Sequence, residues 1–142
     1  MSIQVVAAII VRPDRRLLIG QRRREDSSPL KWEFPGGKVK TGESLEQALA
    51  RELREELGVT VVRAIPISQV EHRYGGDLGS LTITFFAASI LEVQLQPGPF
   101  EQVAWVLPRE LGEYDFLIAN RRVIAELATG RIKPAEILAF SP

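Results

Sequence analysis

The most informative stretch of this 142-residue chain runs from Gly37 to Val59 and reads GKVKTGESLEQALARELREELGV. Leucines recur in it at every fourth position between residues 45 and 57, a spacing that places them on one face of an α-helix. Gly58 follows the last leucine, and glycine is the residue that most often ends a helix. The segment therefore predicts an amphipathic helix from Ser44 to Leu57.

Three glutamates gather on one side of this predicted helix. At about 100° per residue, Glu52, Glu55 and Glu56 fall within one narrow arc beside the leucine face. Like charges three and four residues apart destabilise a helix by about 0.2–0.5 kcal/mol per pair, whereas Mg²⁺ binds carboxylate oxygens together with water and phosphate. The other interpretation is a solvated helix face with an Arg51–Glu55 ion pair. Taken alone, the acidic run leaves both interpretations open.

The rest of the chain predicts strands around this helix. Apolar, β-branched runs indicate strands over residues 3–11, 17–21, 59–71, 81–91 and 102–107, and helical spacing indicates a final helix over 119–128. Turn residues at 13–15 predict that the first two strands form a hairpin, and residues 75–79 predict a second hairpin turn. The apolar stretch 132–140 is expected to dock on the protein body or on a partner. The order predicts an α/β fold with a mixed sheet, in a single domain over residues 1–142.

Composition excludes several classes of function. Lys+Arg and Asp+Glu both number 18, and a chain without a basic excess is not expected to bind a nucleic acid polymer. The chain has no cysteine, which excludes disulfides and thiol nucleophiles, and His72 as its one histidine cannot form a multi-histidine metal site. The longest apolar run, Val5 to Val11, is too short to cross a membrane. We therefore expect a cytoplasmic protein.

The acidic helix belongs to a longer pattern. The sequence has Gly37, five residues, Glu43, seven residues, and then RELREELGV over positions 51–59. This string resembles the Nudix box, G-x5-E-x7-R-E-U-x-E-E-x-G-U with U apolar, at every defined position. The chain is therefore identified as a member of the Nudix hydrolases, which implies an α/β/α sandwich and hydrolysis of a nucleoside diphosphate linked to another group.

The resemblance also implies a metal site. It implies that Glu52, Glu55 and Glu56 bind Mg²⁺ or Mn²⁺ with a backbone carbonyl near Gly36, and that one of these glutamates deprotonates the attacking water. Hydrolysis of a phosphoanhydride needs its charge neutralised, which bound metals do. Arg51, in the same catalytic group, is expected to brace the loop and the helix together with Glu43.

Many MutT-like members of the family add a metal-binding glutamate six residues before a tryptophan. Counted from Trp105, that position is Pro99 in this chain. Glu101 lies two residues later, on the same side of an extended strand, and is the expected substitute.

Within the family, the chain resembles the MutT-like branch, which cleaves nucleoside triphosphates to a monophosphate and pyrophosphate. The resemblance rests on Arg22, on the sequence WEFPGG at 32–37, and on Asn120 after residues 116–119. In that branch the matching asparagine reads the edge of an oxidised guanine, and an amide suits this role because it donates and accepts at once. The implied nucleotide contacts are Arg22, Glu33, Phe34, Pro35, Gly36 and Asn120.

Plainer interpretations exist for three of these residues. Asn120 also suits the N-cap of the last predicted helix. Arg22 is one of three consecutive arginines and also suits a solvated surface, while Phe34 also suits the core.

The leading hypothesis is a triphosphate pyrophosphohydrolase that prefers oxidised purines of the 8-oxo-dGTP type. The alternatives are a CTP or dCTP pyrophosphohydrolase, a hydrolase of dinucleoside polyphosphates (for which Tyr74 is a weak sign) or nucleotide sugars, and a Nudix-fold binding module without catalysis. The expected partner is a small nucleotide, with the chain as a monomer or homodimer.

Overall fold

The computed structural model describes residues 2–73, 79–91 and 95–140. The strands are β1 (Ser2–Ile10), β2 (Leu17–Gln21), β3 (Trp32–Glu33), β4 (Gly36–Lys38), β5 (Val61–Arg73), β6 (Ser80–Ile90) and β7 (Gln102–Val106). The helices are α1 (Leu45–Leu57), α2 (Arg121–Ala128) and α3 (Pro134–Phe140), with 3₁₀ turns η2 (Pro108–Glu113) and η3 (Ile118–Asn120). Of the predicted turn at 75–79, residues 75–78 lie outside the described residues, as does Tyr74.

Two sheets form the centre of the fold. The first has the strand order β4-β1-β6-β5, and the second has the order β3-β2-β7. β1 runs parallel to β6 and antiparallel to β4, whereas β5 is antiparallel to β6 and the second sheet is antiparallel throughout. The predicted mixed sheet is therefore confirmed.

The predicted hairpin between the first two strands is wrong. β1 and β2 belong to different sheets, and the backbone pairing between these segments is an isolated bridge between Val11, just after β1, and Leu17. The physical reason is that β1 is buried on both faces and lies inside its sheet, with partners along both edges. One of these partners, β6, lies far away in the sequence, so local turn residues could not indicate the pairing.

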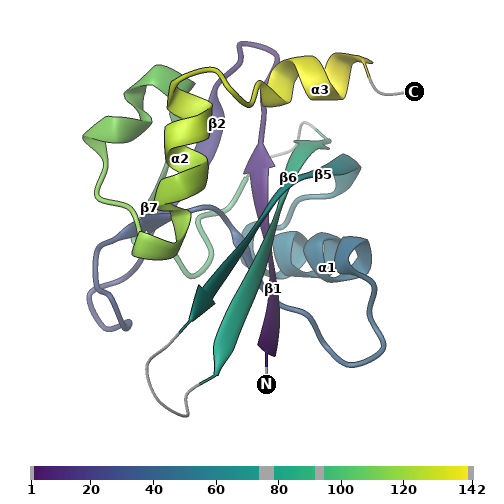
Figure 1. Ribbon diagram of the computed structural model, residues 1–142, viewed down its shortest axis with the longest axis vertical. Coiled ribbons are helices and arrows are strands. Elements are labelled where there is room, and N and C mark those ends of the chain that lie inside the picture. Colours follow the sequence, from purple (N-terminus) through teal and green to yellow (C-terminus); the bar gives the residue numbers. More distant parts are fainter. Residues whose placement is uncertain (1, 74–78, 92–94, 141–142) are drawn as a thin grey trace.

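The core is divided into two apolar layers by the first sheet. Alternation along β1 sends Val6, Ala8 and Ile10 toward α1, and Ala7 and Ile9 toward the side of α2. Figure 1 shows α1 and α2 on opposite sides of the strands β1, β6 and β5. This arrangement confirms the expected α/β/α architecture.

Helix α1 forms where the leucine spacing predicts it. Ser44 accepts a hydrogen bond from the Gln47 backbone N–H, Gln47 reaches back to the Ser44 N–H, and Gly58 ends the helix at φ 68°. The buried residues of α1 are Ala48, Leu49, Leu53 and Leu57. Because this face is fixed against the sheet, the glutamates are held along its margin.

The C-terminal region contains more helix than predicted. The expected helix over 119–128 is divided into η3 and α2, and the apolar stretch 132–140 forms α3. The guanidinium of Arg63 in β5 donates a hydrogen bond to the carbonyl of Leu138 in α3. The stretch therefore docks on the body of the same chain.

Membrane crossing by a helix finds no support in the described part of the chain, where every helix is too short or too polar.

Candidate active site

Two glycines allow β4 to pass closely between β1 and α1. A Cβ on Gly36 would lie 1.9 Å from the carbonyl oxygen of Val6, and one on Gly37 would lie 2.4 Å from the carboxyl carbon of Glu52. Neither approach is possible with a side chain present. In this position the Gly36 N–H donates a hydrogen bond to Glu56 Oε1 at 3.0 Å. The bend therefore positions two carboxylates of α1 against the backbone of β4.

Arg51 ties the loop before α1 to the acidic side of the helix. Its guanidinium donates to both carboxylate oxygens of Glu43, at 2.6 and 2.9 Å, to Glu52 Oε1 at 2.8 Å and to the carbonyl of Lys38 at 3.0 Å. The bond from Arg51, followed by the bond from the Lys40 N–H, lowers the pKa of Glu43 to about 2. These bonds join the loop to the helix, as a bracing role for Arg51 and Glu43 requires.

Glu56 is the electrostatically unusual member of the acidic group. Burial raises its pKa to about 8; the Gly36 N–H opposes this shift, while the charges of Glu52, Glu33 and Glu55 add to it. Glu55 lies apart on the surface, with a side chain 56% exposed and 3.4 Å from Arg51. The site thus concentrates negative charge around a half-buried carboxylate.

A cavity of about 550 Å³ opens beside Glu56. The predicted site residues that line it are Arg22, Glu33, Phe34, Gly36, Glu56 and Asn120. They come from the loop after β2, from β3 and β4, from α1, and from the start of α2, so the fold brings together residues almost 100 positions apart. Its size falls within the range of small-molecule sites.

Asn120 carries a buried acceptor without a partner. The residue is 5% exposed and lines the cavity, and its Oδ1 has no hydrogen-bond partner among the described residues. It stands at the N-cap position of α2 but makes no side-chain capping bond, so the structure does not support the capping interpretation. A buried polar atom without a partner is costly unless a ligand or water supplies one.

Arg22 and Glu33 form an ion pair at the cavity. The Arg22 guanidinium donates to Glu33 Oε2 at 3.2 Å, and also to the carbonyl and the hydroxyl of Ser27 at 2.7 and 3.1 Å. Burial raises the pKa of Glu33, although the charge and hydrogen bond of Arg22 oppose this shift. These hydrogen bonds therefore fix the Arg22 side chain, which is not freely solvated.

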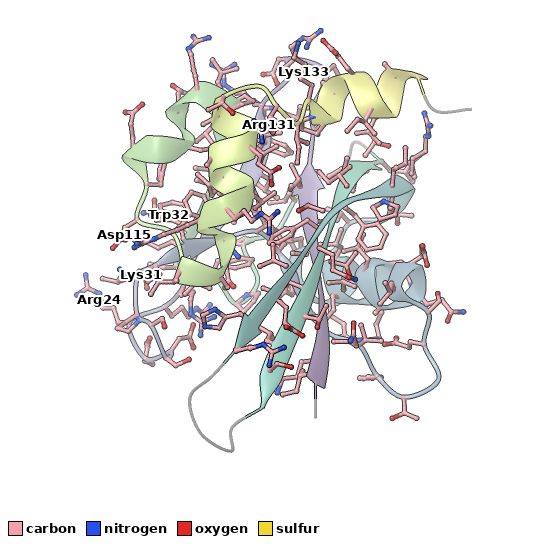
Figure 2. All side chains as sticks on the ribbon, viewed as in Figure 1. Arg24, Lys31, Trp32, Asp115, Arg131 and Lys133 are labelled. Carbon is pink, nitrogen blue, oxygen red and sulfur yellow. The ribbon has the colours of Figure 1, made fainter. Side chains whose placement is uncertain are left out.

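The loop that carries Arg22 is joined to the segment that carries Asn120. Trp32 and Phe116 form a parallel bridge, and Lys31 Nζ lies 2.6 Å from a carboxylate oxygen of Asp115. Figure 2 shows Lys31, Trp32 and Asp115 together near the N-terminal end of α2. These contacts fix the two walls of the cavity relative to each other.

Other predicted residues lie outside the cavity lining. These are Pro35, Arg51, Glu52, Glu55 and Glu101. The Pro35 carbonyl accepts the Ala8 N–H at 2.8 Å, and Glu101 is exposed, with its backbone N–H donating to the Gln21 carbonyl. A ligand role for Glu101 stays a prediction.

Phe34 and three residues without a predicted site role also line the cavity. Phe34 is 3% exposed and packs on Phe85 and Phe116, with ring centroids 6.2 and 5.6 Å away, so it belongs to the core as well as to the cavity wall. Sequence reasoning assigned no site role to Lys31, His72 or Arg121, which also line the cavity. Lys31 and Arg121 directly adjoin Trp32 and Asn120, and this adjacency was the available signal.

The donor set fits a hard divalent cation. No three acidic or histidine side chains among the described residues already converge as a metal-binding group. However, Glu52, Glu55 and Glu33 all raise the pKa of Glu56 through their charge, so the carboxylates lie close enough to repel one another. A cation bound by carboxylate oxygens would relieve this repulsion.

Comparison with known proteins adds to this geometry. Residues 1–127 match the family described as NUDIX domain. The chain is 33% identical over 135 residues to CTP pyrophosphohydrolase of Escherichia coli, covering 94% of this chain and 98% of that protein. It is 30% identical over 126 residues to 8-oxo-dGTP diphosphatase of the same organism, covering 89% and 96%. A solved structure from a study of MutT of Aliivibrio salmonicida and Vibrio cholerae matches with a TM-score of 0.77 at 33% identity, covering 92% and 99%.

Proposed function

Because this chain belongs to the Nudix family of hydrolases, which act on nucleotides, we propose that it hydrolyses nucleoside triphosphates to a monophosphate and pyrophosphate, with Mg²⁺ as cofactor. The favoured substrate is an oxidised purine triphosphate of the 8-oxo-dGTP type. One observation carries this proposal: Asn120 presents a buried amide oxygen without a partner in the same cavity that Glu56 lines.

The amide of Asn120 is suited to reading a base. Its oxygen accepts a hydrogen bond and its NH₂ donates one. An oxidised guanine presents an N7–H donor next to the O6 acceptor, which complements this pair. Since the buried Asn120 oxygen has no hydrogen-bond partner among the described residues, a base that supplies the donor gains a bond without displacing a protein partner.

Glu52, Glu55 and Glu56 are the residues that would hold the metal. When bound, Mg²⁺ supplies positive charge that neutralises the phosphate oxygens. Gly36 fixes Oε1 of Glu56 through its N–H, which leaves Oε2 to bind a ligand or accept a proton. Arg51 holds Glu52 from the other side, and Arg22, fixed by Glu33 and Ser27, provides a cation for the nucleotide.

A CTP or dCTP pyrophosphohydrolase is the second candidate. It is favoured by the E. coli relative of that name, which is similar to this chain over nearly its whole length. Cytosine also offers an adjacent donor and acceptor, at N4 and N3, so Asn120 alone does not distinguish the two substrates. Cavity size does not distinguish them either, because about 550 Å³ accommodates a purine or a pyrimidine.

The test is a panel of triphosphates assayed with Mg²⁺ and ranked by kcat/KM. It contains 8-oxo-dGTP, dGTP, CTP and dCTP, with a dinucleoside polyphosphate and a nucleotide sugar as the remaining family substrates. We expect 8-oxo-dGTP to rank first and the products to be monophosphate and pyrophosphate. Release of orthophosphate with a diphosphate would contradict the proposed bond cleavage, and binding without turnover of any substrate would indicate a non-catalytic module.

A further inference from the structure

A second cavity of about 430 Å³ lies at the opposite end of α2 from Asn120. We call it the α2–α3 groove, because the ends of these helices form it together with the start of η2 and the turn before β2. Figure 2 labels Arg131 and Lys133 in this region, where the chain passes from α2 to α3. The proposed hydrolytic site uses none of its lining residues.

The α2–α3 groove has an excess of positive charge. Arg15, Arg109 and Lys133 line it, and Glu136 is the one carboxylate in the lining. Among the described residues, no ion pair or side-chain hydrogen bond engages these three cations. This contrasts with Arg22 and Arg51, which are both paired.

The neighbouring acids are already engaged elsewhere. The carboxylate of Asp14, next to Arg15, binds Arg12 and Arg16, which lower its pKa to about 2. Glu110, next to Arg109, uses Oε1 to accept the backbone N–H of Leu107. Asp14 and Glu110 therefore adjoin these cations in the sequence, but neither of them lines the groove.

The floor of the α2–α3 groove is apolar. Leu127 is 1% exposed and Leu107, Pro108 and Ile132 are half-buried, whereas the three cations of the lining are exposed. An apolar floor beneath a cationic rim is complementary to a molecule that has an apolar body and an anionic head. The volume lies within the range of small-ligand cavities.

We propose that the α2–α3 groove binds a small organic anion, an apolar ring or chain that bears one phosphate, sulfonate or carboxylate group. The anionic group lies between Arg109 and Lys133, and the apolar part rests on Leu127 and Ile132. An alkyl carboxylate has this chemistry, and a nucleoside monophosphate has it in part, through the face of its base ring and its one phosphate. This site is separate from the proposed hydrolytic site and does not depend on it.

The test is a titration of the ¹⁵N-labelled full chain with anilinonaphthalene sulfonate, a probe with an aromatic body and one sulfonate. We expect the backbone amide signals of Thr129, Gly130 and Ile132 to shift in the NMR spectrum. The double variant Arg109→Gln/Lys133→Gln removes two exposed charge contacts and should weaken the affinity read from these shifts about 2- to 30-fold. Arg24→Gln, which removes an exposed charge that lines neither the α2–α3 groove nor the cavity beside Glu56, should leave the affinity unchanged.

A variant that fills the groove tests its apolar part. Ala128 is exposed and lines the groove, so Ala128→Trp should remove the probe-induced shifts without unfolding the protein, as an unchanged Tm would show. Competition by AMP or by octanoate would identify the natural class of anion. Absence of shifts at Thr129 and Gly130, equal affinity in the double variant and the wild type, or displacement by neither competitor would overturn the proposal.

Discussion

Glu56→Gln should stabilise the protein at alkaline pH while abolishing its activity. Glutamine keeps an amide oxygen for the Gly36 N–H but removes the buried charge. The pKa of Glu56 rises from 4.5 to about 8 on folding, which at 1.36 kcal/mol per tenfold change in proton affinity corresponds to about 5 kcal/mol. Because glutamine also buries an NH₂ group that needs a partner, we expect a net gain of about 2–5 kcal/mol.

The sign of the effect follows from proton binding. Between pH 4.5 and 8 the folded wild type keeps a proton on Glu56 that the unfolded chain has already released. Wild-type stability therefore falls as the pH rises through this window, and the loss is complete above pH 8. The variant has no such group, so it should be no more stable than the wild type below pH 4.5, and its advantage should reach its full value above pH 8.

The assay is urea denaturation of both proteins in EDTA, from pH 4 to pH 9. Glu55→Gln is the matched control, because the Glu55 side chain is 56% exposed and its replacement should change stability little at any pH. Added Mg²⁺ should narrow the difference by stabilising the wild type, and kcat of Glu56→Gln should fall about 100-fold or more. Equal free energies of unfolding for Glu56→Gln and wild type at pH 9 would refute this reasoning.

Three further predictions concern the cavity and its metal. Asn120→Ala should lower kcat/KM for the preferred substrate about 5- to 150-fold. Asn120→Asp should lower it too, because aspartate cannot donate a hydrogen bond to the base. Full activity of the aspartate variant in the triphosphate panel would show that Asn120 has no base-reading role. Gly37→Ala should reduce kcat about 10- to 100-fold, since a Cβ would lie 2.4 Å from the Glu52 carboxyl carbon. Circular dichroism should show an unchanged fold. Turnover near the wild-type rate would show that the position of Glu52 does not matter for catalysis. EDTA should abolish hydrolysis and Mg²⁺ restore it, as followed by pyrophosphate release, whereas activity in chelator would rule out the metal.

Local signals in the sequence predicted local structure well. The leucine period and Gly58 predicted α1, because helix formation depends on residues three and four positions apart. The pairing of β1 could not be predicted in this way, because its long partner β6 begins 70 residues beyond the end of β1. The turn at 13–15 signals a reversal of the chain, and the structure shows that this reversal leads into a different sheet.

The candidate site divides in the same way. The three glutamates lie within five consecutive residues of α1, so the sequence alone predicted the acidic group. It did not predict the raised pKa of Glu56. The raised pKa of Glu56 depends on burial and on Glu33, which reaches the site from β3. Likewise, the sequence left Asn120 as either a cap or a base reader; its missing capping bond argues against the cap, while the base-reading role stays a prediction.

This division has a consequence for substrate choice. Glu52 and Glu56 of α1 are held by Arg51 and by the Gly36 N–H, so both contacts come from the pattern at residues 37–59 and the one residue before it. Asn120 lies outside that pattern, in a segment that is held at the cavity by the bridge between Trp32 and Phe116. We therefore expect that the residues proposed for hydrolysis and the residue proposed to contact the base can change separately, apart from the charge of Glu33 near Glu56. A relative can keep the same acidic helix while its base contact changes, which is consistent with one chain being similar to both a CTP pyrophosphohydrolase and an 8-oxo-dGTP diphosphatase.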